Sequence, residues 1–255
     1  MISPAVLSGV GAGLFGAIFG SFLNVVVHRL PRRESLVHPG SRCPSCQTEI
    51  AVYDNVPVLS WVLLRGRCRG CQAAISARYP AVELLTALTF VGVVLARGVD
   101  PLLLIELPLA ALLLTVAGID LEHRIIPNRL LAPAAIYGVI ASALLRPDEL
   151  PELALAGAGA FVFLLVAAVA YPGGMGMGDV KLAGVLGLYL GVSVLPALMG
   201  AFLAGSVVGL AIIARYGAAA RKRGVPFGPF LALGGLVGLL AGPELIQVYL
   251  STFVS

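Results

Sequence analysis

Charged residues are scarce in this chain of 255 residues: Asp, Glu, Lys and Arg make up 12% of it, whereas about 25% is typical of a soluble domain. Aromatic residues are also few, at 7%, and no basic and aromatic pattern indicates binding to nucleic acid. Hydrophobic residues make up 59%, and the mean hydropathy is +0.98. The composition excludes an ordinary soluble domain and predicts a polytopic membrane protein.

Familiar hydrolase signatures are missing as well. The chain contains no Gly-x-Ser-x-Gly and no His-Glu-x-x-His motif. Its three histidines, His28, His38 and His123, are scattered. Serine-nucleophile and zinc-peptidase chemistry therefore have little support in the sequence.

The first apolar segment has no Lys or Arg before it, and Arg29, Arg32 and Arg33 follow it at once. A secretory signal has the reverse order, with positive charge first and a cleavage site after. We therefore expect a retained membrane span whose N-terminus lies outside.

Seven apolar stretches predict about eight transmembrane helices, because each span needs roughly 20 residues. The sixth stretch has 33 residues without a charge and would be about 50 Å long as one helix. We expect it to break near residues 191–196 into two spans. No internal repeat is evident, and the abundant Gly and Ala favour close helix packing. The stretches cover residues 5–27, 81–96, 101–119, 130–145, 153–171, 182–214 and 225–250.

The distribution of positive charge supports eight spans. With the N-terminus outside, the cytoplasmic segments hold 15 of the 17 Lys and Arg residues, and only Arg97 and Arg146 fall outside. Seven spans would place the basic cluster 215–223 outside, against this bias. The eight-span topology predicts that both termini are outside and that the long segment 29–79 is cytoplasmic.

All four cysteines lie in that segment, as two Cys-x-x-Cys pairs separated by 21 residues. Two such pairs are the signature of a tetrathiolate zinc site, in which each turn delivers two thiolates to the metal, and the spacer is only slightly longer than the usual length of about 15–20 residues. Disulfides are disfavoured in the cytoplasm, so the alternatives are reduced thiol pairs or redox dithiols. Zinc would stabilise a loop too small to hold a core alone. The predicted ligands are Cys43, Cys46, Cys68 and Cys71.

Two aspartates lie at the edges of apolar runs. Asp120 follows the run 109–119, and Asp179 ends the glycine-dense turn 173–178. Acidic groups in a membrane are costly, at about 2.5–3.5 kcal/mol at a helix centre, and are usually functional. The alternatives are that Asp120 marks a helix end and that Asp179 caps a helix starting at Val180. Their common predicted face and the glycines, which allow close backbone approach, favour one paired site.

Paired carboxylates can hydrolyse a peptide bond without an acyl-enzyme. The two groups share one proton, so the ionised group takes a proton from water while the protonated group hydrogen-bonds the carbonyl. Glu83 and Glu106 also interrupt apolar stretches, and either could form a packing hydrogen bond or touch substrate. A cation transporter or channel is the alternative function, although its acids are expected near mid-bilayer and often within inverted repeats.

Several ordered motifs resemble the type IV prepilin peptidases, the GxGD class of intramembrane aspartic proteases. Asp120 precedes Pro127-Asn128, where some relatives have Asp at the second position, and Gly176-x-Gly178-Asp179 precedes Lys181. The remaining similarities are Gly20–Val26 with Arg29-Leu30-Pro31, the two cysteine pairs with Tyr53, Asn55, Pro57, Ser60 and Trp61 between them, and Pro226–Phe230.

The resemblance implies an all-α inner-membrane enzyme with Asp120 and Asp179 as the catalytic pair. It implies removal of the basic leader from type IV prepilins and type II secretion pseudopilins, after a glycine at the cytoplasmic face. Membrane lipid is the other expected partner, and no nucleic acid is expected. The supporting motif residues are Gly176, Gly178, Lys181, Pro127 and Asn128.

The resemblance also implies, from the presence of the cysteine loop, a bifunctional enzyme that N-methylates the new N-terminus with S-adenosylmethionine. The sequence has no Gly-rich methyltransferase fingerprint, so the loop is either only a structural cap or also a cofactor site. We expect a first helix over residues 1–28, a zinc-stapled loop domain over 29–79 and a seven-helix peptidase core over 80–255. Glu34 or Glu122 could contact basic leader residues.

Overall fold

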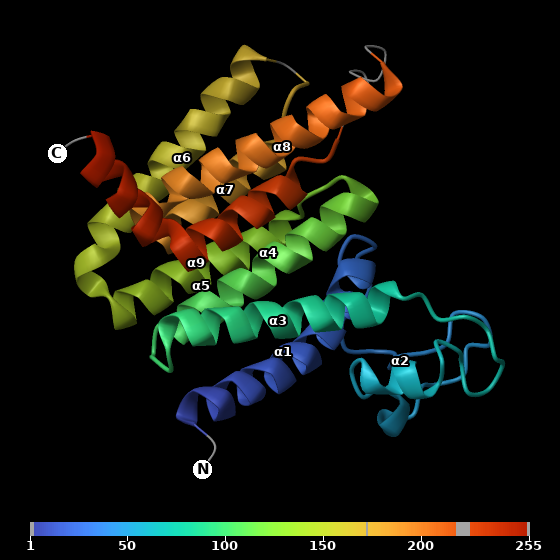
Figure 1. Cartoon of the computed structure of the whole chain (residues 1–255). Coiled ribbons are helices and arrows are strands. Elements are labelled where there is room, and N and C mark those ends of the chain that lie inside the picture. The colour runs from blue at the N-terminus through green and yellow to red at the C-terminus, as the bar shows by residue number, and fades with distance from the viewer. Residues whose placement is uncertain (1–2, 172, 218–224, 254–255) are drawn as a thin grey trace. The chain divides into compact units, whose positions relative to one another are not determined.

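The computed structural model describes residues 3–171, 173–217 and 225–253, and the part described is helical, with two isolated β-bridges in one loop (Figure 1). Contacts divide the chain into two compact units, Met1–Asp100 and Pro101–Ser255. The all-α prediction is confirmed. The predicted domain boundaries at residues 28 and 79 separate a first helix, a loop domain and a peptidase core by their functions. This division stays a prediction.

The first unit consists of two long helices that pack along each other and the segment that joins them. Gly16 and Gly20 allow the contact, because a Cβ on them would lie 2.8 Å from Ala87 Cα and 2.7 Å from Glu83 Cα. The predicted close packing at small residues is thus observed here. The elements are α1 (Pro4–Arg29), η1 (Val52–Asp54), α2 (Leu59–Leu63) and α3 (Arg78–Arg97).

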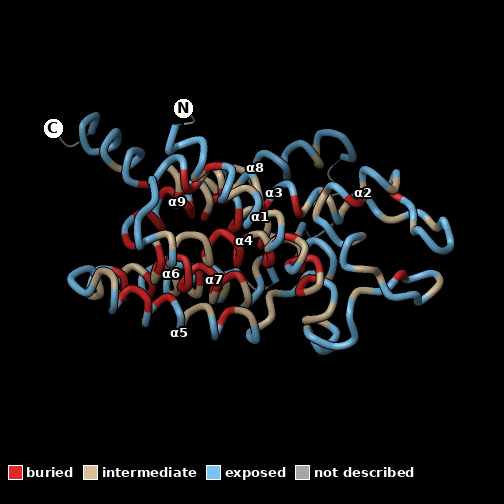
Figure 2. Tube along the Cα trace, turned by 90° about the horizontal axis from the view of Figure 1, so that it is seen from below, coloured by how far each residue is buried: buried red, intermediate tan, exposed pale blue. Residues whose placement is uncertain are grey.

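The second unit is a bundle in which α6 packs on α7, α8 packs on α9, and α4 packs on α9. Buried residues, red in Figure 2, are frequent in α4 and α7. The elements are α4 (Leu103–His123), α5 (Asn128–Leu145), η2 (Pro147–Glu149), α6 (Leu150–Ala170), α7 (Met177–Leu190), η3 (Gly191–Ser193), α8 (Val194–Tyr216) and α9 (Gly228–Phe253).

Seven helical stretches of the described chain are long and apolar enough to cross a membrane. The longest, Met177–Tyr216, contains both α7 and α8, and η3 separates them where Gly191 adopts a positive φ of 56°. The predicted break near residue 191 is confirmed. The described residues thus form eight helices of 14 residues or more, and the crossing of the membrane by all eight stays a prediction.

Helix α7 is shorter than a membrane span should be. Its 14 residues extend about 21 Å, less than the roughly 30 Å of hydrocarbon. Nine of these residues are buried, so most of the helix faces protein instead of lipid. The far end of α7 is closed by Arg146, whose Nη2 donates to the carbonyl of Tyr189 at 2.6 Å. This hydrogen bond gives a structural reason for Arg146, which the predicted topology places outside the cytoplasmic segments.

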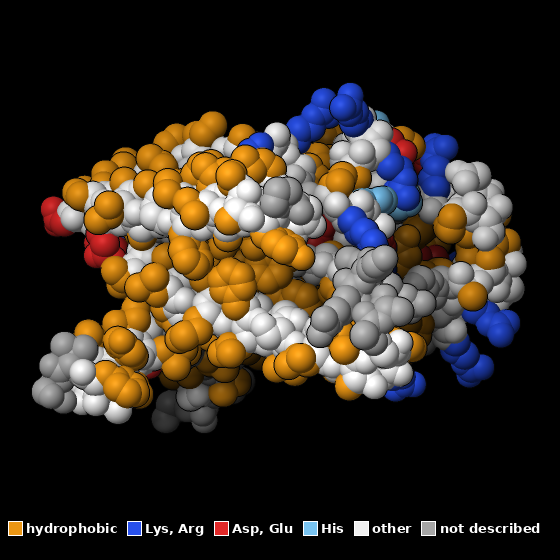
Figure 3. Space-filling view, turned by 90° about the horizontal axis from the view of Figure 1, so that it is seen from above, with side chains coloured by type: hydrophobic (Ala, Val, Ile, Leu, Met, Phe, Trp, Pro, Cys, Tyr) orange, Lys and Arg blue, Asp and Glu red, His pale blue; other side chains and the backbone are white. Residues whose placement is uncertain are grey.

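The outer surface of the helices is rich in exposed apolar side chains, as expected for contact with lipid. Figure 3 shows hydrophobic side chains, in orange, over much of the visible face. Examples with more than half of the residue exposed are Leu7, Leu88, Leu155, Val166 and Leu210.

Candidate active site and metal centre

Asp120 lies in the last turn of α4 and is buried, with 5% of its surface exposed. The helix ends at His123, and the next residue, Arg124, adopts a left-handed conformation and donates its N–H to the carbonyl of Asp120 at 3.0 Å. The side chain points to the start of α9: the backbone N–H of Gly228 donates to its Oδ2 at 2.9 Å. Asp120 is therefore more than a helix-end marker, because it joins two segments 108 residues apart.

Asp179 is the third residue of α7, and 8% of its surface is exposed. Its Oδ2 accepts a hydrogen bond from the N–H of Gly176 at 3.0 Å. The expected alternative, an N-cap on a helix starting at Val180, is wrong, because α7 begins at Met177. An acidic side chain at the third position of a helix accepts a hydrogen bond from the N–H of the N-cap residue. The N-cap here is Gly176, which has no side chain to accept the second hydrogen bond of a capping box.

Each carboxylate is thus held through one oxygen by a glycine N–H. A Cβ at Gly228 would lie 2.7 Å from Asp120 Oδ2, and one at Gly176 would lie 3.2 Å from Asp179 Oδ2. The first distance is shorter than real Cβ contacts, so a side chain at position 228 would displace the carboxylate. The arrangement depends on residues without side chains.

Other contacts bring the ends of α4, α5 and α7 together. A Cβ at Gly178 would lie 2.8 Å from Ile126 Cβ, in the short turn that follows Asp120. Lys181 Nζ donates to Asn128 Oδ1 at 3.0 Å, next to Pro127, which caps α5. Through these contacts the end of α4, which carries Asp120, and the start of α7, which carries Asp179, lie beside each other. The predicted supporting residues therefore all belong to one region.

Gly228 is the residue whose function the sequence did not reveal. Its motif was noticed only as part of a resemblance, and nothing local connects position 228 with position 120. A glycine followed by proline at the start of a helix was the available signal. Only the tertiary contact assigns it a partner.

The four cysteine sulfurs lie within 4.8 Å of one another and could hold a metal ion. Cys43 Sγ is 3.7 Å from Cys71 Sγ, and Cys46 Sγ is 4.0 Å from Cys68 Sγ. These distances are far longer than a disulfide bond and match the edge of about 3.8 Å that zinc–sulfur bonds of about 2.3 Å give to a tetrahedron. Hydrogen bonds from Thr48 lower the pKa of Cys46 to about 6, which favours its thiolate form.

The two cysteine turns are copies of each other, so the expectation of no internal repeat is wrong for this loop. In both, the N–H of the first cysteine bonds the carbonyl five residues on, and a glutamine with positive φ follows the second cysteine. The shared sequence signal was Arg-Cys-x-x-Cys-Gln-x-x-Ile, which occurs over 42–50 and 67–75. The motif is only nine residues long and occurs twice, 25 residues apart, so a search for longer sequence repeats does not detect it.

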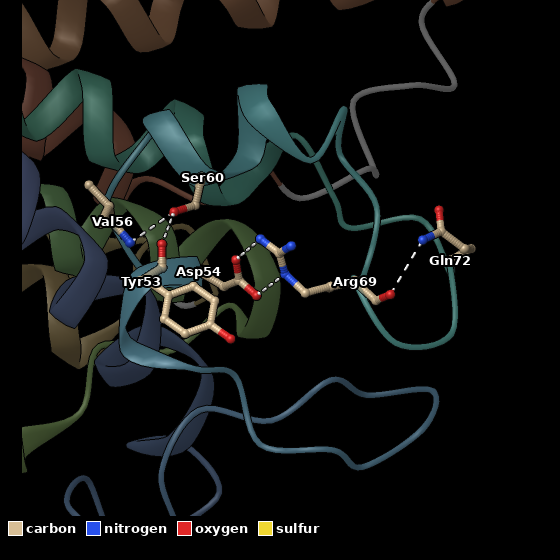
Figure 4. Close-up of polar contacts among 6 residues, drawn as sticks. All are labelled: Tyr53, Asp54, Val56, Ser60, Arg69 and Gln72. Carbon is tan, nitrogen blue, oxygen red and sulfur yellow. Dashed lines mark hydrogen bonds and ion pairs between the residues drawn. The ribbon is translucent and has the colours of Figure 1, made fainter.

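An ion pair joins the second cysteine turn to η1 (Figure 4). Arg69 lies between Cys68 and Cys71, and its Nε and Nη2 donate to the two Asp54 oxygens at 2.7 and 2.6 Å. The Arg69 guanidinium lowers the pKa of Asp54, and it lies 5.6 Å from the centre of the Tyr53 ring. This side chain therefore links the thiol cluster to the rest of the loop.

Glu83 makes a packing contact, one of the two alternatives left open for it. The residue is buried in α3, and its Oε2 accepts a hydrogen bond from the N–H of Val58 at 2.7 Å. Glu83 thus anchors the residue before α2 to the helix pair.

Comparison with known proteins gives two family matches. Residues 14–97 match the bacterial peptidase A24 N-terminal domain, and residues 107–214 match the type IV leader peptidase family. Together these matches cover the cysteine loop and both aspartates. No solved structure matches the chain significantly.

Three relatives carry the name prepilin leader peptidase/N-methyltransferase. The protein of Aeromonas hydrophila is 36% identical, and the alignment covers 94% of this chain and 93% of the relative. That of Bacillus subtilis is 35% identical, with 93% and 96% covered. That of Pseudomonas aeruginosa is 35% identical, with 93% and 91% covered.

Proposed function

We propose, from the premise that this chain belongs to the type IV leader peptidase family, that it is a prepilin peptidase and N-methyltransferase of the membrane. Its substrates are type IV prepilins and the pseudopilins of type II secretion, whose basic leader it removes after a glycine. The observation that carries the peptidase assignment is the pair of buried carboxylates, Asp120 and Asp179, each held by one glycine N–H.

The proposed mechanism uses the carboxylate oxygens left over by those two hydrogen bonds. One aspartate is ionised and takes a proton from a water molecule, whose oxygen attacks the scissile carbonyl carbon. The other aspartate is protonated and donates to the carbonyl oxygen, which stabilises the tetrahedral intermediate. The C–N bond then breaks as the amine of the product receives a proton, and the pair again holds a single proton.

The proposed location is the inner membrane, with the aspartates and the cysteine loop on the cytoplasmic side and both termini outside. The distribution of arginine supports it, because eight arginines lie in residues 29–79 and Arg124 and Arg129 lie at the turn between α4 and α5. The basic cluster after α8 includes Arg221, Lys222 and Arg223, which lie outside the described residues. A substrate with a basic leader before an apolar helix would present its scissile bond at this face.

Zinc is the metal we propose for the four thiols, with a structural function. All four ligand positions are cysteines, so the site is closed and lacks the open position that catalytic zinc needs. When bound, zinc would hold the two turns together by neutralising their thiolates. The peptidase step needs no contribution from it.

The methyltransferase activity uses S-adenosylmethionine and is supported by the names of the relatives. The cysteine loop is the proposed location, on resemblance alone. A cation transporter, the alternative function, is not favoured: the two aspartates lie at helix ends, whereas the acids of a transporter are expected near mid-bilayer.

The purified protein incubated with a prepilin, with and without S-adenosylmethionine, tests both activities. Mass spectrometry of the substrate should show loss of the leader after a glycine in both samples, and an added methyl group only with the cofactor. Leader removal without any methylation would reject the second activity alone. An intact substrate would reject the peptidase.

A further inference from the structure

The short helix of the cysteine loop exposes one apolar face. In α2, Leu59, Val62 and Leu63 lie three and four residues apart, so they share one side of the helix. Their exposed fractions are 54%, 57% and 72%. We call these three residues the α2 face. Apolar side chains grouped in this way mark a contact with another apolar phase or partner.

The depth of α2 is fixed by its attachment to α3. Val58, the residue just before α2, donates its N–H to the Glu83 carboxylate at 2.7 Å. Glu83 is five residues into α3, about 7.5 Å along the axis at 1.5 Å per residue. The short helix therefore lies level with the first turns of a membrane-spanning helix, where the headgroup region of a bilayer is expected.

The charge around the α2 face suits anionic lipid. Arg65 and Arg67 follow the helix directly and are both exposed. Residues 29–79 contain eight arginines against three acidic residues, a net charge of +5. Such a segment attracts the anionic headgroups of a membrane surface and disfavours a basic peptide as the occupant.

We propose that the α2 face inserts into the membrane interface and that Arg65 and Arg67 contact the phosphates of anionic lipids. The loop is then an interfacial anchor as well as a metal site. Apolar side chains enter the boundary between headgroups and acyl chains, as in other interfacial helices, while the arginine stems extend to the phosphates. The two tethers, α1 and α3, hold the anchor at the membrane.

The only tryptophan of the chain, Trp61, lies within α2 and reports on this contact. Its Nε1 donates to the carbonyl of Ile75 at 3.1 Å, which fixes the ring in the loop. Full-length protein is placed in nanodiscs that contain phosphatidylglycerol or phosphatidylcholine with brominated acyl chains at equal mole fraction. Bromine quenches tryptophan fluorescence only at short range.

We expect stronger quenching by brominated phosphatidylglycerol than by brominated phosphatidylcholine. Leu63→Glu should reduce quenching in both lipids, and Arg65→Gln with Arg67→Gln should remove the difference between them. Val37→Glu is the matched control, because Val37 is 73% exposed in the same loop but outside the α2 face, and it should leave quenching unchanged.

Equal quenching by the two lipids would overturn the proposal, and so would a Leu63→Glu variant that is quenched like the wild type. Bound metal is measured in every variant to establish that the loop is folded. If Leu63→Glu loses metal, Val62→Ser gives the same comparison with a smaller change. A change in Trp61 fluorescence when prepilin is added, without quenching by either brominated lipid, would identify the substrate as the occupant of the α2 face. That result would also contradict the proposal.

Discussion

The aspartate site and the cysteine loop are built in opposite ways. The aspartate site joins residues from α4, α7 and α9, up to 108 positions apart, through backbone N–H groups of glycines. The loop site comes from two short segments of one connection that share a sequence motif and a turn geometry, and it is formed by four side chains. One added methyl group should therefore disturb the first site, whereas the second should tolerate changes that spare its thiols.

The largest effect is expected from the carboxylates themselves. Asp120→Asn or Asp179→Asn should each reduce prepilin cleavage by at least about 10²–10⁴-fold, because an amide cannot exchange the shared proton. The amount of protein in the membrane and the amount of bound metal per chain should equal those of the wild type. Asp148→Asn, at an exposed aspartate in η2, is the matched control and should cleave normally. The measurement is the initial rate of leader removal by purified protein.

Gly228→Ala tests whether the backbone contact matters. The new Cβ would lie 2.7 Å from Asp120 Oδ2 and should push the carboxylate out of place. Misplacement of a reacting group by about 1 Å can cost about 100-fold in rate, and we expect a loss of that order. Gly159→Ala is the control, because no atom lies within 4 Å of its added Cβ. Equal cleavage rates for the two alanine variants would rule out positioning by Gly228.

Cys43→Ser should act on the loop more than on cleavage. Loss of one of four thiolates should bring bound zinc from one ion per chain to nearly none, as measured by metal analysis of the purified protein. Cleavage should fall by a smaller factor than in Gly228→Ala. Ser45→Ala, inside the same turn, should keep the metal. Full zinc content in Cys43→Ser would contradict the tetrathiolate site.

The smallest effect is expected from the exposed Asp54–Arg69 ion pair. Asp54→Asn should modestly increase the rate of limited proteolysis within residues 30–77. Arg69 lowers the pKa of Asp54, so the pair stabilises the loop above the ordinary aspartate pKa of about 3.9 and loses its effect as the pH falls through the lowered value. The wild type and the variant should therefore differ at pH 7 and converge in acid. A difference that persists at low pH would contradict this cause.

The sequence predicted the helices and the cluster of four cysteines because both signals are local. Apolar run length determines a span, so the predicted break near residue 191 agrees with η3. Two Cys-x-x-Cys turns identify four ligands without reference to any other part of the chain. The repeat that contains them was equally local, but it is only nine residues long.

Long-range contacts account for what the sequence did not predict. Gly228 is assigned only by its bond to Asp120, and the packing contact of Glu83 depends on Val58, 25 residues away. The start of α7 was misplaced by three residues because glycine-rich turns give little indication of where a helix begins. Hydropathy locates helices, but it does not show which backbone groups their polar side chains meet.

The most direct test of the central claim, that Asp120 and Asp179 act as one unit, is the residual cleavage rate of the double variant Asp120→Asn/Asp179→Asn beside those of the two single variants. Our account predicts that the double variant is no slower than either single one, because removing one member already destroys the shared-proton pair. Losses that multiply would show two independent residues, and a single variant with the wild-type rate would contradict the catalytic pair altogether.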